Sequence, residues 1–377
     1  MEERLSNGIV RNLINLKEWP TLHQLKKYKY SFIPVACLTI ICIGILCGLP
    51  HNAEAAIQEF TLSGHTAYIR SIDISTDGRY LVSGGEDCIP RVWDLSNGTL
   101  FKSLTSYTEV DNKNRTHTIQ GHKKEVLSCA FSQDSKVIVT GDYDGHIKLW
   151  SVDSGKITLS IDSSSGCFSE RFSNDGKYLA DAGVFDNITI WSTDKGAYDG
   201  HTLGVTKIPF QIAFSNDNKL VAAGNDYGKV QLWINKNGDR PELRTLSQSN
   251  KWNTVSEIAF SPDDKLLVAG SSTYPDKTCH NLKLWEVDTG RLIWSAVGDS
   301  AGLNSVTFSP DGKKIATLGE SLKVWDISGN LLKEIQLKSI AISKFRSIQK
   351  VRILSDGKII ACKSDGNSIK VWIIKDE

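Results

Sequence analysis

Residues 121–150 read GHKKEVLSCAFSQDSKVIVTGDYDGHIKLW, and they decide the fold of this 377-residue chain. Apolar and polar residues alternate in three short runs that are typical of β strands, with a tight turn at Asp134-Ser135 between the first two. His122, Thr140 and Asp144 stand among these runs. They have the side-chain types of a base, a nucleophile and an orienting acid, but the same groups can equally hold a fold together.

The strand pattern recurs along the chain. An Asp-led turn follows an apolar strand seven times, and a tryptophan follows each turn. The interval from Asp to Trp is 16 residues in five units, 22 in the fifth and 14 in the sixth. Repeats of four short strands predict the blades of a β-propeller. The seven pairs are Asp77 and Trp93, Asp134 and Trp150, Asp175 and Trp191, Asp217 and Trp233, Asp263 and Trp285, Asp311 and Trp325, and Asp356 and Trp372.

Two neighbouring units share one polar quartet. A His precedes a Ser or Thr by 18 residues, and this hydroxyl residue precedes an Asp by four residues and the Trp by ten. A catalytic constellation would not be copied into two units at one geometry, whereas a buried network that fixes the turns of a blade would. We therefore predict two structural tetrads, His65, Ser83, Asp87 and Trp93 in the first unit and His122, Thr140, Asp144 and Trp150 in the second.

The later units depart from the quartet. Asp181, Ala223 and Cys362 stand at the Ser/Thr position of three of them. We therefore expect blades three to seven to depend mainly on the apolar packing of their tryptophans, each of which stabilises by a few kcal/mol when buried.

The stretches GH…SGGEDCIPRVWD and GH…TGDYDGHIKLW resemble the WD-repeat family in their dipeptides and in their spacing, from about residue 60 to the carboxyl end. The resemblance implies an all-β, seven-bladed propeller over residues 59–377 that serves as a monomeric platform for binding other molecules, usually proteins. It also assigns the polar quartet to a structural network. The expected partner is thus a protein or peptide, and no catalytic residue, cofactor or metal is expected.

The two ends of the chain are expected to close the ring. Only five residues follow Trp372, too few for another strand, and residues 59–62 have strand character without a unit of their own. This segment would complete the seventh blade and remove an exposed sheet edge.

Residues 32–49 stand apart from the repeats. They form a run of 18 residues without a charge, long enough to reach across most of a bilayer. Lysines precede the run and acidic residues follow it, so the charge asymmetry places the amino end inside and the propeller outside. We expect a polar segment over 1–31, one hydrophobic helix over 32–50, a short linker over 51–58 and then the propeller.

The same run has other interpretations. The small residues around Ala55 form a cleavage pattern, so the run can be a signal peptide and the propeller a secreted or periplasmic protein. A buried helix of a soluble protein is a third interpretation.

Composition and motifs limit the function classes. The chain has 44 basic and 43 acidic residues, so it lacks the excess of positive charge that nucleic-acid binding uses. One alternative is a propeller hydrolase or lyase with a site in the central channel, but no G-x-S-x-G, H-E-x-x-H or phosphate-loop motif is present. A membrane-anchored cytoplasmic scaffold is the other alternative, and only the charge asymmetry argues against it.

Three long connections are the candidate partner-binding loops. They span residues 248–254, 271–281 and 338–350, and they carry aromatic and basic side chains of the types found at interaction hot spots. The pair Cys279-His280 lacks the further ligands that a zinc site needs. The candidate residues are Trp252, Tyr274, His280, Lys344, Phe345 and Arg346.

Overall fold

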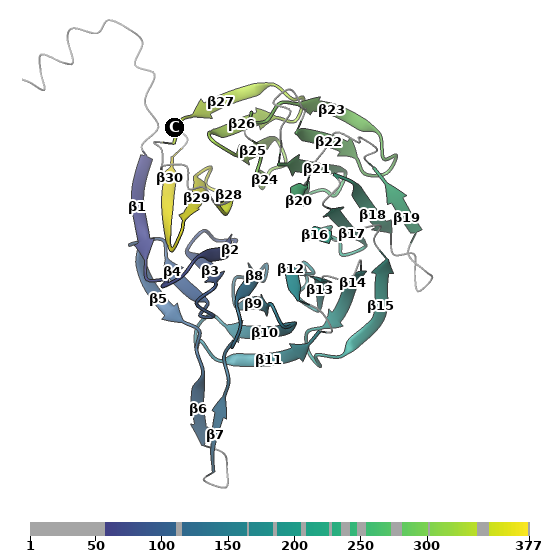
Figure 1. Cartoon of the computed structure of the whole chain (residues 1–377). Helices are drawn as coiled ribbons and strands as arrows, with labels where there is room; N and C mark the ends of the chain where they lie inside the picture. Colours follow the sequence, from purple (N-terminus) through teal and green to yellow (C-terminus); the bar gives the residue numbers. More distant parts are fainter. Residues whose placement is uncertain are drawn as a thin grey trace, which may run out of the picture. The chain divides into compact units, whose positions relative to one another are not determined.

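The computed structural model describes residues 57–110, 115–163, 166–183, 187–204, 209–225, 228–234, 242–246, 254–272, 281–300, 302–337 and 347–375. Every element in these ranges is a β strand. Twenty-eight of the strands form seven four-stranded antiparallel sheets, arranged radially around a central axis (Figure 1). The predicted seven-bladed β-propeller is therefore confirmed.

The predicted hydrophobic helix over residues 32–50 lies outside the described residues. Within the part of the chain that is described, no helix has the length and apolar character needed to cross a membrane.

Each sheet is one blade, and its strands follow one another from the axis to the rim. Blades one to three contain β2 (Ile69–Ile74), β3 (Tyr80–Gly85), β4 (Arg91–Asp94) and β5 (Thr99–Ser103); β8 (Val126–Phe131), β9 (Val137–Asp142), β10 (His146–Ser151) and β11 (Ile157–Asp162); and β12 (Cys167–Phe172), β13 (Tyr178–Gly183), β14 (Asn187–Ser192) and β15 (Tyr198–Gly204). Blades four to six contain β16 (Pro209–Phe214), β17 (Leu220–Asn225), β18 (Val230–Ile234) and β19 (Glu242–Thr245); β20 (Val255–Phe260), β21 (Leu266–Ser271), β22 (Leu282–Glu286) and β23 (Leu292–Ala296); and β24 (Ser305–Phe308), β25 (Lys314–Leu318), β26 (Leu322–Asp326) and β27 (Leu331–Ile335).

Blade seven is built from both ends of the described chain. Its inner strands are β28 (Gln349–Ile353), β29 (Ile359–Asp365) and β30 (Ser368–Ile374), and its rim strand is β1 (Ile57–Ser63). β1 pairs with β30 along its full length, and Trp372 Nε1 donates a hydrogen bond to Glu59 Oε2 (3.1 Å). The predicted ring closure is confirmed, and its rim strand β1 begins at Ile57.

The apolar core is divided among the seven contacts between neighbouring blades. Each contact has its own cluster of buried side chains drawn from both blades. In six of these clusters the repeated tryptophan is one of the buried members. In the contact between blades two and three, Trp191 is only partly buried. The period-two pattern of the strands thus buries both faces of each blade.

Side chains also link the first turns of neighbouring blades. Ser135, Asn218 and Asp264 have left-handed backbones, with φ close to 60°. Each side chain accepts a hydrogen bond from a backbone N–H in the turn of the preceding blade, namely Thr76 N (3.1 Å), Asn174 N (2.6 Å) and Asn216 N (2.7 Å) respectively. A glycine would adopt the turn without strain but would remove this link between blades.

One hairpin departs from the radial plan. β6 (Tyr107–Val110) and β7 (Thr116–Ile119) pair with each other between blades one and two and project beyond the rim of the ring (Figure 1). The base of the hairpin is attached to blade two, because the Tyr107 hydroxyl accepts a hydrogen bond from Ile157 N (3.1 Å) and Lys156 Nζ lies 2.8 Å from Glu109 Oε1.

Candidate functional site

The four residues predicted for blade one form a continuous buried network. Trp93 Nε1 donates to Ser83 Oγ (2.8 Å), Ser83 Oγ lies 2.7 Å from His65 Nε2, and His65 Nδ1 lies 2.9 Å from Asp87 Oδ2. A neutral imidazole that donates from Nδ1 to the carboxylate accepts at Nε2 from the hydroxyl. Arg91 Nη1 also donates to Asp87 Oδ2 (2.6 Å). Hydrogen bonds therefore connect β3 and β4 with the segment that enters blade one.

Blade two forms the same network with a different acid. Trp150 Nε1 donates to Thr140 Oγ1 (2.7 Å), which lies 2.6 Å from His122 Nε2. His122 Nδ1 is 2.9 Å from Asp142 Oδ2, so the acid is Asp142 and the predicted Asp144 is wrong.

The correction has a simple physical reason. Asp142 is the last residue of β9, and its carboxylate also accepts hydrogen bonds from the backbone N–H groups of Asp144 (3.1 Å) and His146 (2.9 Å). Asp144 lies in the turn itself, and its half-exposed side chain faces Lys124 at 3.8 Å. In blade two, His122 therefore finds its acceptor at the end of β9.

The protonation states agree with a structural role. Burial is the largest influence on His122 and lowers its pKa below 6.5, so the ring stays neutral at neutral pH. Burial alone would raise the pKa of Asp142, but the hydrogen bonds from His122 and His146 hold it below its usual value. Because the His122 side chain is fully buried, neither it nor Thr140 can reach a substrate.

Two further tryptophans have acceptors that sequence analysis missed. Trp325 Nε1 in blade six donates to Thr317 Oγ1 (3.0 Å), and Trp372 Nε1 in blade seven donates to Glu59 in the closing strand. Thr317 lies eight residues before its Trp rather than ten, because the hairpin of blade six is two residues shorter. The signal for Thr317 was therefore present but displaced.

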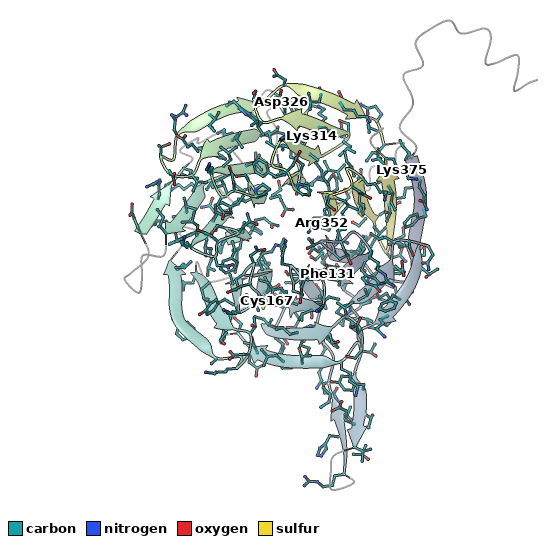
Figure 2. All side chains as sticks on the ribbon, turned by 180° about the vertical axis from the view of Figure 1, so that it is seen from behind. Phe131, Cys167, Lys314, Asp326, Arg352 and Lys375 are labelled. Carbon is teal, nitrogen blue, oxygen red and sulfur yellow. The ribbon has the colours of Figure 1, made fainter. Side chains whose placement is uncertain are left out.

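Charged side chains from four blades meet near the axis of the ring. Lys350 Nζ lies 3.0 Å from Glu257 Oε2 and 3.8 Å from Asp73 Oδ1. Arg352 approaches Asp73, and Arg171 approaches Glu257, each at 3.8 Å. Four of these residues, all except Glu257, line a cavity of about 230 Å³, and Figure 2 places Arg352 toward the centre of the ring. The cluster thus joins blades one, three, five and seven by ion pairs across the axis.

Blade three carries an acid at the position where blades one and two carry the hydroxyl residue of the tetrad. Asp181 occupies the position of Thr140, and Ser163, which occupies the position of His122, donates to Asp181 Oδ2 (2.6 Å). Glu170 lies directly opposite Asp181 in the β12–β13 pair. Burial, and secondly the charge of Asp181, raises the pKa of Glu170, and burial also raises the pKa of Asp181.

The sequence repeats match a known family model. The model described as WD domain, G-beta repeat matches residues 57–94, 113–151, 193–233 and 240–286. The chain carries WD repeats and folds into a seven-bladed propeller. Three of the four matches begin at or just before a rim strand and end with the third strand of the next blade, so a sequence repeat of this WD-repeat propeller is offset from a structural blade.

Several curated proteins are similar to this WD-repeat propeller. Apoptotic protease-activating factor 1 from Rattus norvegicus is 25% identical over 317 residues, which cover 78% of this chain and 23% of that protein. Autophagy-related protein 16 from Arabidopsis thaliana is 23% identical over 305 residues, covering 72% of this chain and 58% of that protein. Serine-threonine kinase receptor-associated protein from Gallus gallus is 24% identical over 320 residues, covering 83% and 81%. The chain therefore spans less than two thirds of the first two relatives.

The residues of the WD-repeat propeller that were predicted to bind a partner all lie outside the described residues. They are Trp252, Tyr274, His280, Lys344, Phe345 and Arg346. The strands that flank their segments are described. The segments lie next to the first residues of β20, β22 and β28 and the last residue of β21. Because strands alternate in direction within each blade, these four strand ends share one face of the ring.

Proposed function

We propose that this WD-repeat propeller is a non-catalytic platform that binds a protein or peptide on one face of the ring. The observation that supports it most is that the side chains of types that could act in catalysis are already engaged in hydrogen bonds or ion pairs within the fold. His65 and His122 are fully buried in hydrogen-bond networks. The charged groups near the axis are also engaged, because each cation of that cluster faces a carboxylate.

The relatives support a protein partner. Their names describe a factor that activates a protease and a protein associated with a receptor. We place the binding surface on the face where the segments 248–254, 271–281 and 338–350 connect the strands, because these segments carry the aromatic and basic residues.

Proximity labelling from the carboxyl terminus of the full chain tests this function with two matched triple variants. The first, Lys344→Ala with Phe345→Ala and Arg346→Ala, alters the proposed face. The second, Lys177→Ala with Lys219→Ala and Lys265→Ala, removes three highly exposed lysines from the first turns on the opposite face. A partner that the first variant loses and the second retains supports the proposal. Identical labelling by wild type and both variants contradicts it.

We also propose that the chain is held at a membrane through residues 32–50, with the propeller on the outer side. The uncharged run and the charges around it support this placement. A reporter that is active only outside the cytoplasm, fused to the carboxyl end, is expected to be active in membrane fractions. Activity in the soluble exported fraction indicates cleavage near Ala55, and an inactive reporter indicates a cytoplasmic scaffold.

A further inference from the structure

Blade three differs from the other blades at three positions that face one another. In five other blades the residue pair equivalent to Glu170 and Asp181 is uncharged. These pairs are Ile72 with Ser83, Cys129 with Thr140, Ile212 with Ala223, Ile258 with Ala269, and Val306 with Thr317. Cys167 opens the paired part of β12, where four other blades have Ile69, Val126, Pro209 and Val255. Blade three alone among these combines a thiol with two carboxyl groups.

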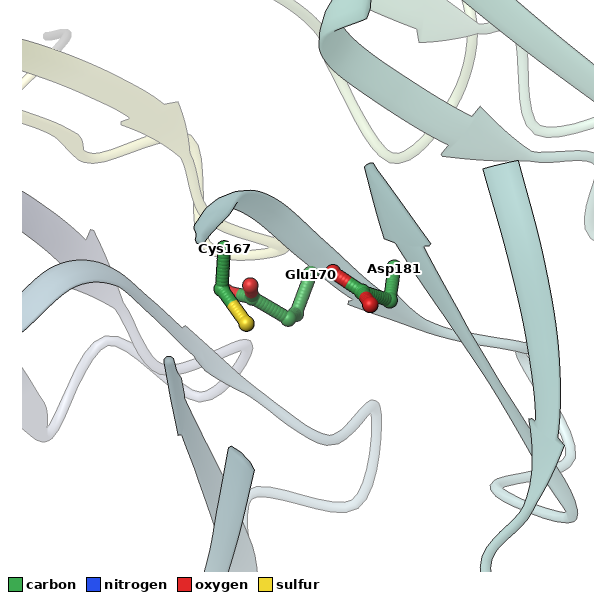
Figure 3. A group of neighbouring side chains, drawn as sticks. All are labelled: Cys167, Glu170 and Asp181. Atoms are coloured by element: carbon green, nitrogen blue, oxygen red, sulfur yellow. The ribbon is translucent and has the colours of Figure 1, made fainter. Parts of the chain in front are cut away.

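The three side chains converge. A sulfur atom of Cys167 and one carboxylate oxygen each from Glu170 and Asp181 all lie within 4.8 Å of one another. Figure 3 shows the three groups gathered at the start of β12 and the facing part of β13. All three residues are buried, with relative exposures of 0%, 0% and 2%.

Several polar atoms of the cluster have no hydrogen-bond partner. The atoms that are buried without a hydrogen-bond partner include both carboxylate oxygens of Glu170, Asp181 Oδ1 and Ser169 Oγ. A buried carboxylate without a partner costs several kcal/mol, so such groups are normally paired or bound to a cation. Arg171 does not supply that pairing, because its guanidinium donates to the backbone carbonyl of Glu170 (2.8 Å) and turns toward Gln211 and Glu257.

The neighbouring blade is shaped around this cluster. Gly141 in β9 packs against it, and a Cβ atom at that position would lie 2.4 Å from Glu170 Oε1 and 2.5 Å from the Cβ atom of Cys167. Any larger residue would occupy the space beside the donor atoms.

We propose that Cys167, Glu170 and Asp181 form a buried binding site for a divalent transition-metal ion of the zinc type. One sulfur and two carboxylate oxygens suit Zn²⁺, whereas Mg²⁺ and Ca²⁺ select oxygen ligands alone. The two positive charges of the ion would offset two of the three negative charges of the ligands. Binding releases to solvent the proton of the thiol and any proton held by the carboxyl groups.

The burial of the site assigns the ion a structural role. It would join β12 to β13 at the place where the hydroxyl and imidazole join strands in blades one and two. The metal would thus perform in blade three the function that the tetrads perform in blades one and two.

The test uses the purified full chain, treated with a chelator and then titrated with Zn²⁺ or Co²⁺. We expect one Co²⁺ per chain with a sulfur-to-cobalt charge-transfer band, and a higher thermal midpoint with Zn²⁺. Cys167→Ser is expected to abolish the band. Glu170→Gln and Asp181→Asn are each expected to weaken Zn²⁺ binding by more than the ~10–100-fold that loss of an outer-shell partner costs. Cys129→Ser, which alters a buried thiol with no carboxyl group opposite it, should retain the band and the shift.

Two results would overturn the proposal. The first is wild-type protein that shows neither the band nor a Zn²⁺-dependent midpoint, which would identify the cluster as a proton-sharing pair of carboxyl groups. The second is a band that persists in Cys167→Ser, which would place the ion on another thiol. Neither result depends on whether the carboxyl variants fold, since wild type and the serine variant decide both.

Discussion

Blades two and three are built on the same strand pattern, but their equivalent positions carry different polar side chains. In blade two, Thr140 and His122 form a neutral network that ends at Asp142. In blade three, the equivalent positions carry Asp181 and Ser163. The strand register is nevertheless the same, because Ile138 lies opposite Trp150 and Leu179 opposite Trp191. Strand alternation and turns therefore specify the blade, and the polar groups determine how strongly its strands are held together.

Removing the imidazole from blade two should cost more than removing its counterpart from blade three. We expect His122→Ala to lower the free energy of unfolding by about 2–5 kcal/mol, because the change leaves a cavity and removes a hydrogen-bond partner from both Asp142 and Thr140. Ser163→Ala removes a single hydrogen bond to Asp181 and is expected to cost only about 1–3 kcal/mol. Chemical denaturation of both variants measures the difference, and equal losses would contradict the comparison.

Replacing the acid of blade three by the residue type of its neighbours should stabilise the metal-free protein. Glu170→Ile introduces the side chain found at the equivalent position of blades one, four and five. We expect the free energy of unfolding in chelator to rise by about 1–4 kcal/mol, because a buried ionisable group is exchanged for an apolar one. The matched change in blade two, Cys129→Ile, should give no such gain. A loss of stability in Glu170→Ile would show that the acid is needed even without metal.

The hydroxyl of the tetrad should contribute in proportion to its hydrogen bonds. Thr140→Val breaks contacts with both His122 and Trp150 and is expected to cost about 1–3 kcal/mol. Thr317→Val in blade six loses only the contact with Trp325, so its cost should be smaller. Urea denaturation of the two variants ranks them, and the reverse order would contradict the role of the imidazole.

Acid should affect the first two blades through their histidines. Burial, as the largest cause, lowers the pKa of both His65 and His122 below 6.5. The unfolded state therefore binds more protons below pH 6.5, so this stability is complete above pH 6.5 and is lost as the pH falls toward the folded-state pKa. The slope is at most about 1.4 kcal/mol per pH unit for each imidazole. The His122→Gln variant should show a shallower loss between these limits when unfolding is measured against pH, and an unchanged slope would contradict it.

The smallest expected effect lies in the turn between the second and third strands of blade one. Cys88 has a left-handed backbone (φ 62°) where blade two has Gly145 (φ 90°). Cys88→Gly should raise the thermal midpoint slightly, with a gain of about 0.5–1 kcal/mol, because the strain of a left-handed non-glycine residue exceeds the entropy cost of glycine. The reverse change, Gly145→Cys, should lower it.

Most of the fold could be predicted because its signals are local. Each strand alternates with period two, each first turn begins with Asp, and residues 59–62 lacked a blade. The network of blade one could also be predicted, because its spacing matches the family pattern.

The missed features depend on geometry across strands. Asp142 and Asp144 both follow Thr140 closely, and only the end of β9 decides which one faces His122. The cluster of blade three joins residues of two strands, so a search for His and Cys spacings overlooked it. The available signal was Glu170, a charged residue at a buried position of β12.

The rim position of β1 also affects how the protein is made. β1 leaves the ribosome before every other strand of the ring, but its partner β30 is among the last, and the bonded residues Glu59 and Trp372 are 313 positions apart. At translation rates of roughly 5–20 residues per second, about 15–60 s pass before β30 is synthesised, and until then the backbone groups of β1 lack their hydrogen-bond partners. Nascent chains therefore carry an open ring for most of their synthesis, and molecular chaperones that shield strand edges have their longest opportunity to act at this segment.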